Sequence, residues 1–134
     1  NADITFKSSD NVLFKVYKTY LNAASDGFAV PELVSTETDV VPLDEPSEVL
    51  EVLFQFIHPC LESQKYRQPS VIDMEISLFF LVAEAAEKYV VFGATNTFAT
   101  RMHQLTSQNP IEILNYSSKH GYPSLADEVA ILAL

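Results

Sequence analysis

The spacing of apolar residues changes once along the chain, and this change restricts the fold more than any other feature. Near the N-terminus, apolar and polar residues alternate in Ile4-Thr5-Phe6 and again in Phe14-Lys15-Val16, on either side of Ser8-Ser9-Asp10-Asn11. Alternation with period two around a turn-rich tetrapeptide predicts a β-hairpin. From Val49 onward the spacing is three or four residues, which predicts helices. The expected fold is therefore α+β, with helix dominant.

Two short helical turns and one strand are expected between the hairpin and the long helices. Lys18–Ala24 has the pattern of a short helix, and Ser25 is placed to cap one further turn that buries Phe28. Asp39–Leu43 predicts a third strand, at a sheet edge because Pro42 has no N–H to donate. Three strands cannot cover themselves, so a cluster of helices should pack on this small sheet.

The later helices are predicted from their start and stop residues. Asp44 is placed to cap the first, the Ser70–Asp73 segment resembles a capping box, and Asn109–Glu112 combines a cap, a proline and an acidic residue. Gly121 is expected to end that helix, and Pro123 to begin the last one. The residues expected to face inward are Val49, Leu50, Leu53, Phe56, Ile57, Ile72, Ile76, Phe79, Ala83, Ala86, Val90, Phe98, Met102, Leu105, Leu125, Val129 and Leu132.

Charge is strongly uneven in this chain of 134 residues, whose net charge is −10. No lysine or arginine occurs between Lys18 and Lys65. The acidic residues in that interval are Asp26, Glu32, Glu37, Asp39, Asp44, Glu45, Glu48, Glu51 and Glu62. Nucleic-acid binding is disfavoured because it requires clustered cations. The acidic interval predicts either a solvated face or a patch that attracts a basic partner.

The reactive side chains do not form a recognisable catalytic or metal-binding motif. Cys60 is the only cysteine, and His58 is the only other potential metal ligand of its kind near it in sequence, whereas a zinc site needs about four ligands. We therefore expect no metal, no cofactor and no enzymatic activity. The lone cysteine and the lack of an apolar run long enough to span a membrane predict a cytoplasmic or nuclear protein.

Five segments, in this order, resemble the BTB/POZ family and in particular its fungal, basidiomycete-like branch. They are Asp3–Phe6, Phe14–Leu21, Val41–Pro46, Phe56–Pro59 and Ala85–Tyr89. The resemblance covers residues 3 to about 105, and the last two helices are similar to the fungal C-terminal extension. It implies a single BTB/POZ-like domain over 1–134, with a core at 1–105 and a helical extension at 106–134.

The sequence departs from the family pattern at three places. Tyr17 stands where the family usually has histidine, and His58 stands where it usually has tyrosine. Pro31 and Glu32 replace an expected Met-Phe pair. The resemblance therefore implies that the helix with which many members hold their partners is shortened here.

The function that the resemblance implies is protein–protein interaction, as an oligomerisation or adaptor domain. One such role recruits targets to a cullin-based ubiquitin ligase through Phe28–Val34 and the helix Ser47–Ile57, because Val30-Pro31-Glu32 has the hydrophobic-x-Glu form of some cullin-recruiting members. The candidate partner-binding residues are Phe28, Val30, Glu32 and Val34. Asp3 and Lys18 resemble a charged-groove pair, for which a structural role is favoured over ligand recognition.

Two alternatives stay open at this stage. One is a dimerisation domain of a transcription or chromatin regulator. The other is a small-molecule-binding or cryptic enzymatic domain that uses the groove near Asp3 and Lys18. Many family dimers exchange a strand that precedes the position of Asp3, so for a sequence that begins at Asn1 we expect at most a weak or non-exchanged dimer.

Overall fold

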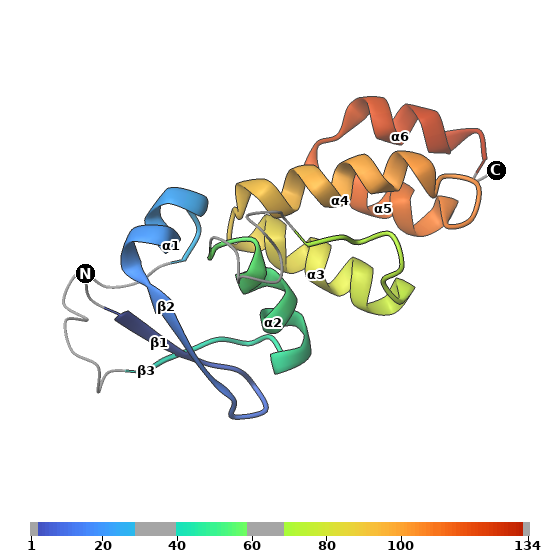
Figure 1. Ribbon diagram of the computed structural model, residues 1–134. Helices are drawn as coiled ribbons and strands as arrows, with labels where there is room; N and C mark the ends of the chain where they lie inside the picture. The colour runs from blue at the N-terminus through green and yellow to red at the C-terminus, as the bar shows by residue number, and fades with distance from the viewer. Residues whose placement is uncertain (1–2, 29–39, 59–68, 133–134) are drawn as a thin grey trace. The chain divides into compact units, whose positions relative to one another are not determined.

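The computed structural model describes residues 3–28, 40–58 and 69–132. These residues form three strands and six helices, which confirms the helix-dominant α+β fold with a small three-stranded sheet (Figure 1). The chain divides into two compact units, an N-terminal unit at Asn1–Thr95 and a C-terminal unit at Asn96–Leu134. The division lies within helix α4 (Phe92–Gln104), earlier than the boundary at 105 and 106 suggested by the sequence.

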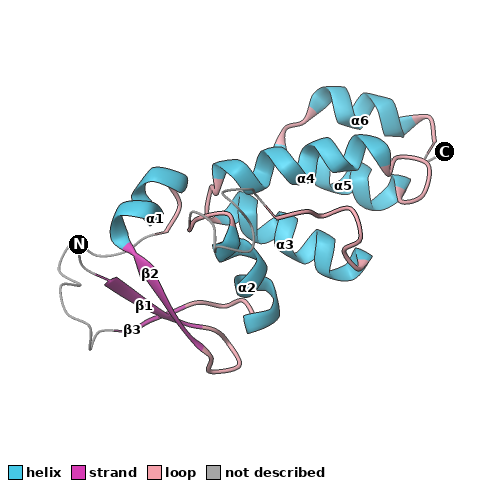
Figure 2. Cartoon of the chain, viewed as in Figure 1, coloured by secondary structure: helices cyan, strands magenta, loops and turns pink. Residues whose placement is uncertain are grey.

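The sheet of the N-terminal unit has the strand order β2-β1-β3 (Figure 2). Strand β1 (Asp3–Lys7) pairs antiparallel with β2 (Leu13–Tyr17), as the predicted hairpin requires. Strand β3 (Val40–Pro42) pairs in parallel with β1 and forms one edge, which confirms the expected edge strand. Alternation directs Ile4, Phe6 and Val16 inward, and these apolar side chains are buried.

Helix α1 (Lys18–Ala24) begins and ends where the sequence predicted. The further turn expected after Ser25 is wrong, because residues 25–28 are not helical. Ser25 has extended backbone and forms a bridge with Val91, while its hydroxyl donates to the Leu21 carbonyl at 2.7 Å. Phe28 stacks on the Tyr89 ring instead of packing within a helical turn.

Helix α2 (Ser47–Gln55) packs against the sheet through Phe54, whose ring contacts Phe6 and Phe14. The expectation that Asp44 caps this helix is wrong. Asp10, in the hairpin turn, takes that role because its carboxylate accepts hydrogen bonds from the Ser47 backbone N–H at 2.7 Å and from the Ser47 hydroxyl at 2.6 Å.

Helix α3 (Ile76–Lys88) starts later than the Ser70–Asp73 segment predicted. The Glu75 carboxylate caps it by accepting from the backbone N–H groups of Ser77 at 2.6 Å and Leu78 at 3.3 Å. The predicted inner stripe is correct at Phe79, Ala83 and Ala86, which are buried. It is wrong at the positions outside the helix or at its first residue, which are exposed: Ile72, Ile76 and Val90.

In the C-terminal unit, the predicted starts of the last two helices and the predicted end at Gly121 are confirmed, although the Asn109 side chain makes no cap hydrogen bond. Helix α5 (Pro110–His120) and helix α6 (Pro123–Ala130) each begin with a proline, and Gly121 ends α5 with a φ of 78°. The buried apolar residues of this unit are Phe98, Met102, Leu105, Ile113, Tyr116, Leu125 and Val129. Leu132, expected to face inward, is exposed. None of the helices within the described ranges has the length and apolar character needed to cross a bilayer.

Candidate functional site

The structure describes only part of the predicted partner-binding set. Val30, Glu32 and Val34 lie outside the described residues, whereas Phe28 is described and half-buried. Phe28 lines two clefts in the N-terminal unit, with volumes of about 310 and 420 Å³. Phe28, the described member of the predicted set, therefore contributes to two candidate binding surfaces.

The smaller cleft contains Lys18, the second half of the predicted charged pair. Lys18 begins α1 and lines this cleft together with Asn22 and Asp26. The backbone of Asp3 pairs with Tyr17, but its side chain lies outside what the structure describes, so the pairing of Asp3 with Lys18 stays a prediction.

The larger cleft, called the Phe28 cleft below, has apolar walls and a charged rim. Its lining residues are Phe6, Gly27, Phe28, Val41, Pro42, Leu43, Asp44, Lys88 and Tyr89. The Phe28 and Tyr89 rings are nearly parallel, with centroids 4.3 Å apart, and Phe6 lies 5.4 Å from Phe28. Three aromatic rings from three different segments thus form one wall of this cleft.

Gly27 permits that arrangement by letting two backbone segments approach closely. Its N–H donates to the Tyr89 carbonyl at 2.9 Å, and the Asp26 N–H donates to the Val90 carbonyl at 3.1 Å. A Cβ atom on Gly27 would lie 2.5 Å from the Tyr89 carbonyl carbon. Only glycine fits here without a shift of the backbone, and the next residue, Phe28, stacks on Tyr89.

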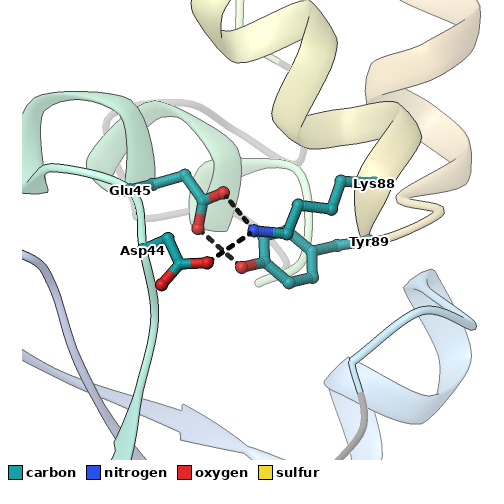
Figure 3. Close-up of polar contacts among 4 residues, drawn as sticks. All are labelled: Asp44, Glu45, Lys88 and Tyr89. Carbon is teal, nitrogen blue, oxygen red and sulfur yellow. Dashed lines mark hydrogen bonds and ion pairs between the residues drawn. The ribbon is translucent and has the colours of Figure 1, made fainter.

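A polar network holds the rim of the Phe28 cleft (Figure 3). Glu45 accepts hydrogen bonds from the Tyr89 hydroxyl at 2.6 Å and from the Lys88 ammonium at 2.9 Å, and Lys88 also lies 3.3 Å from Asp44. The Lys88 Nζ is 5.0 Å from the centre of the Tyr89 ring. The network joins the segment after β3 to the end of α3.

Two pKa values in this network depart from their ordinary range. Burial, followed by the hydrogen bond to Glu45, raises the pKa of Tyr89 to about 12. The hydrogen bond to the Glu45 carboxylate raises the pKa of Lys88. Both groups therefore stay protonated at neutral pH and act as hydrogen-bond donors, which suits a structural role better than proton transfer.

A second cluster of aromatic rings lies at the junction of β2 and α1. Tyr17 stacks on His58 with centroids 5.6 Å apart, and Tyr20 contacts both rings edge-on at 5.6 and 5.5 Å. Tyr17 and Tyr20 are 45% and 37% exposed. Tyr17 and His58, two positions at which the sequence differs from the BTB/POZ pattern that it resembles, are thus in contact with each other.

Sequence patterns identified members of these sites but not their partners. Asp44-Glu45 and Lys88-Tyr89 both belong to segments that carry the resemblance, yet Asp44 was assigned to helix capping. No local signal connects residues 44 positions apart, as Glu45 and Tyr89 are. Within the described ranges, no group of three or more His, Cys, Asp or Glu side chains is placed to hold a metal ion.

A scan against protein-family models found no match, and a search of curated proteins found no similar sequence.

Proposed function

We propose that this chain is a protein-interaction module of the BTB/POZ type that works as an adaptor or oligomerisation domain. The observation that carries the proposal is the Phe28 cleft. Its apolar wall and charged rim have the composition of interface pockets that receive a partner's anchoring side chain. Phe28, which lines this cleft, is one of the candidate partner-binding residues predicted from the sequence.

The charges around the cleft favour a partner with a basic residue next to an apolar one. The Asp44 side chain is 95% exposed, whereas Glu45 is mostly enclosed and engaged with Lys88 and Tyr89. Asp44 therefore offers a largely exposed carboxylate at the rim, with its Oδ2 atom 3.3 Å from Lys88. The net charge of −10 would also attract a basic partner at long range.

Site-specific photo-crosslinking tests the proposal. A photoreactive phenylalanine analogue in place of Pro42, an exposed residue that lines the same cleft, should capture a defined protein in cells, and Phe28→Ala should abolish that product. The matched control carries the same analogue in place of Asp127, an exposed residue of α6 in the C-terminal unit. The same products from both positions, or products that persist in Phe28→Ala, would contradict the proposal.

Two further measurements separate the adaptor role from oligomerisation. Calorimetric titration with a cullin N-terminal domain should give binding at micromolar concentration if the chain is an adaptor for a ubiquitin ligase, and its absence would remove that role. Sedimentation analysis over a range of protein concentrations tests oligomerisation. A single sedimenting boundary of monomer mass at all concentrations would exclude the oligomerisation role.

A further inference from the structure

Strand β2 presents an unusual outer face to solvent. Leu13, Lys15 and Tyr17 point away from the core, whereas Val16 points inward and is buried. The solvated face of an antiparallel sheet is normally polar. Here the two end positions of the strand carry an apolar and an aromatic residue. Leu13 is 59% exposed and Tyr17 is 45% exposed. Leu13 and Tyr17 are thus exposed apolar or aromatic side chains that a chain lying along β2 could contact.

The backbone of β2 is also oriented for pairing on its outer side. The Ser8 N–H donates to the Val12 carbonyl, and the Leu43 N–H donates to the Lys7 carbonyl. Given the register and the alternation of an antiparallel pair, the N–H and C=O groups of Leu13 and Lys15 point away from β1. Among the described residues no strand follows β2 on that side, since the order is β2-β1-β3.

The next outward N–H on this edge already has an acceptor. Tyr17 donates its N–H to Nε2 of His58 at 3.4 Å, and the His58 ring stacks on the Tyr17 ring. His58 thereby ends the open edge at Tyr17. The length left for pairing includes Leu13 and Lys15, with the Tyr17 ring available beside it as an aromatic surface.

Two lysines hold register positions on this face, and Asp3, opposite Tyr17, holds a third charged position. Lys15 is exposed and has no ion pair among the described residues, and Lys7 lies on the same face of the sheet, opposite Leu13 in the register. Opposite charges directly across two strands stabilise their pairing, and like charges oppose it. An added strand is therefore favoured when an acidic residue faces Lys15.

We propose that the outer edge of β2 binds an extended segment of a partner protein as an added strand. The segment would carry apolar, acidic and apolar or aromatic residues at alternate positions, facing Leu13, Lys15 and Tyr17 in turn. Because the acidic residue is in the middle, this order of residue types fits a partner strand that runs parallel or antiparallel to β2. The inference rests on the proposed interaction function and assigns it a second surface, apart from the Phe28 cleft, with a defined partner chemistry.

An edge lysine also has a simpler role, since proteins use lysine at sheet edges to discourage pairing. The two roles differ in their response to charge reversal. If Lys15 only protects the edge, an acidic peptide should not bind there. If Lys15 selects the partner, Lys15→Glu should weaken an acidic peptide and accept a basic one.

The test is a titration followed by nuclear magnetic resonance on the whole 15.0 kDa chain. The probe is a short blocked peptide with Leu, Glu and Phe at alternate positions and Thr between them, and the control peptide has Lys in place of Glu. We expect the acidic peptide to shift the amide signals of Leu13 and Lys15 and to slow their hydrogen exchange. Lys15→Glu should weaken that peptide about tenfold and bind the Lys peptide instead.

The matched variant is Lys119→Glu, which makes the same charge change at an exposed position of α5. It should leave the affinity unchanged. Shifts confined to other residues, no shift at millimolar peptide, or equal affinity in Lys15→Glu would each overturn the inference. Signals of β2 that shift with protein concentration alone would assign the edge to a second copy and would also overturn it.

These outcomes are distinguishable from failure of the proposed function. A selective crosslink at residue 42 without peptide binding at β2 would retain the interaction module and remove only this second surface. Peptide binding at β2 without a crosslink at residue 42 would remove the Phe28 cleft as the carrier of the proposed function.

Discussion

The two units of this chain secure their helices in different ways. In the C-terminal unit, α5 and α6 begin at their own prolines, and α5 ends at the neighbouring Gly121. In the N-terminal unit, the first turn of α2 is held by Asp10, which is 37 residues away from Ser47. Groups that are close in sequence thus set these helix ends in the C-terminal unit. In the N-terminal unit α3 is also capped locally, by Glu75, whereas α2 depends on a group that only the folded chain brings near it.

Gly27 and Gly121 show the same contrast. Gly121 has a φ of 78° and open space around its Cα, so it is needed for its backbone conformation. Gly27 is needed for space, because a Cβ there would collide with the backbone of Tyr89. Substitution by alanine therefore tests a local backbone requirement at residue 121 and a long-range packing requirement at residue 27.

The largest effect is expected at Gly27. Gly27→Ala should lower the free energy of unfolding by about 3 kcal/mol, because the added methyl group must displace backbone atoms. Gly121→Ala should lower it by only about 1 kcal/mol, through strain at positive φ. Asparagine should be tolerated better than alanine at residue 121 but not at residue 27. Denaturant unfolding of the four variants measures this, and equal losses from both alanine substitutions would break the comparison.

A smaller effect is expected at the rim network. Tyr89→Phe removes the hydroxyl that donates to Glu45 and should lower the free energy of unfolding by about 1.5 kcal/mol, since the acceptor is charged and largely enclosed. Tyr20→Phe is the control, because the Tyr20 hydroxyl makes no hydrogen bond within the described ranges. A loss as large in the control would argue against a special role for the Glu45 contact.

A pH-dependent effect is expected at Asp10. Hydrogen bonds, first from the Ser47 hydroxyl and then from the Ser8 hydroxyl, lower the pKa of Asp10 to about 2. A lowered folded-state pKa means that the ionised group stabilises the fold above its unfolded pKa of about 4, and that this contribution is lost as the pH falls through about 2. The melting temperatures of the parent and Asp10→Asn should therefore differ near neutral pH and converge in acid. A constant gap between pH 5 and 2 would show that Asp10 acts without its charge.

The smallest effect is expected at the surface pair of the C-terminal unit. His103 and Glu128 approach to 2.7 Å, but both side chains are more than two-fifths exposed. Glu128→Gln should lower the free energy of unfolding by about 0.5 kcal/mol or less, as for other exposed pairs. Denaturant unfolding at low and high salt provides the check. A loss as large as that of Tyr89→Phe would contradict the view that this unit relies on its local helix signals and core.

The features predicted correctly from the sequence are mainly those with local causes. The hairpin, helix α1 and the proline at the start of α5 each follow from residues within a few positions of one another. The helix caps at Asp44 and Ser70 were wrong because several nearby residues can cap a helix, and the tertiary fold decides which one does. For α2 the cap came from Asp10, and for α3 from Glu75.

The candidate site was predictable only in part for the same reason. Phe28 was identified from its segment, but the surface around it combines side chains from the sheet, the segment after β3 and the end of α3. The alternation of β2 was evident in the sequence, yet the exposure of its outer residues depends on which neighbours the fold supplies. Tyr17 and His58 were noticed separately, and only the fold places them in one stack.

The hydrogen bonds of Gly27 have a consequence for the order of events during synthesis. The N–H groups of Asp26 and Gly27 find their acceptors at Val90 and Tyr89, near the other end of the N-terminal unit. As the chain leaves the ribosome, β1, β2 and α1 emerge long before those carbonyls do. Contacts between distant segments form late and slowly. The Phe28 wall can therefore be completed only after α3 has been made, and until then the emerging aromatic residues are exposed to chaperones and to one another.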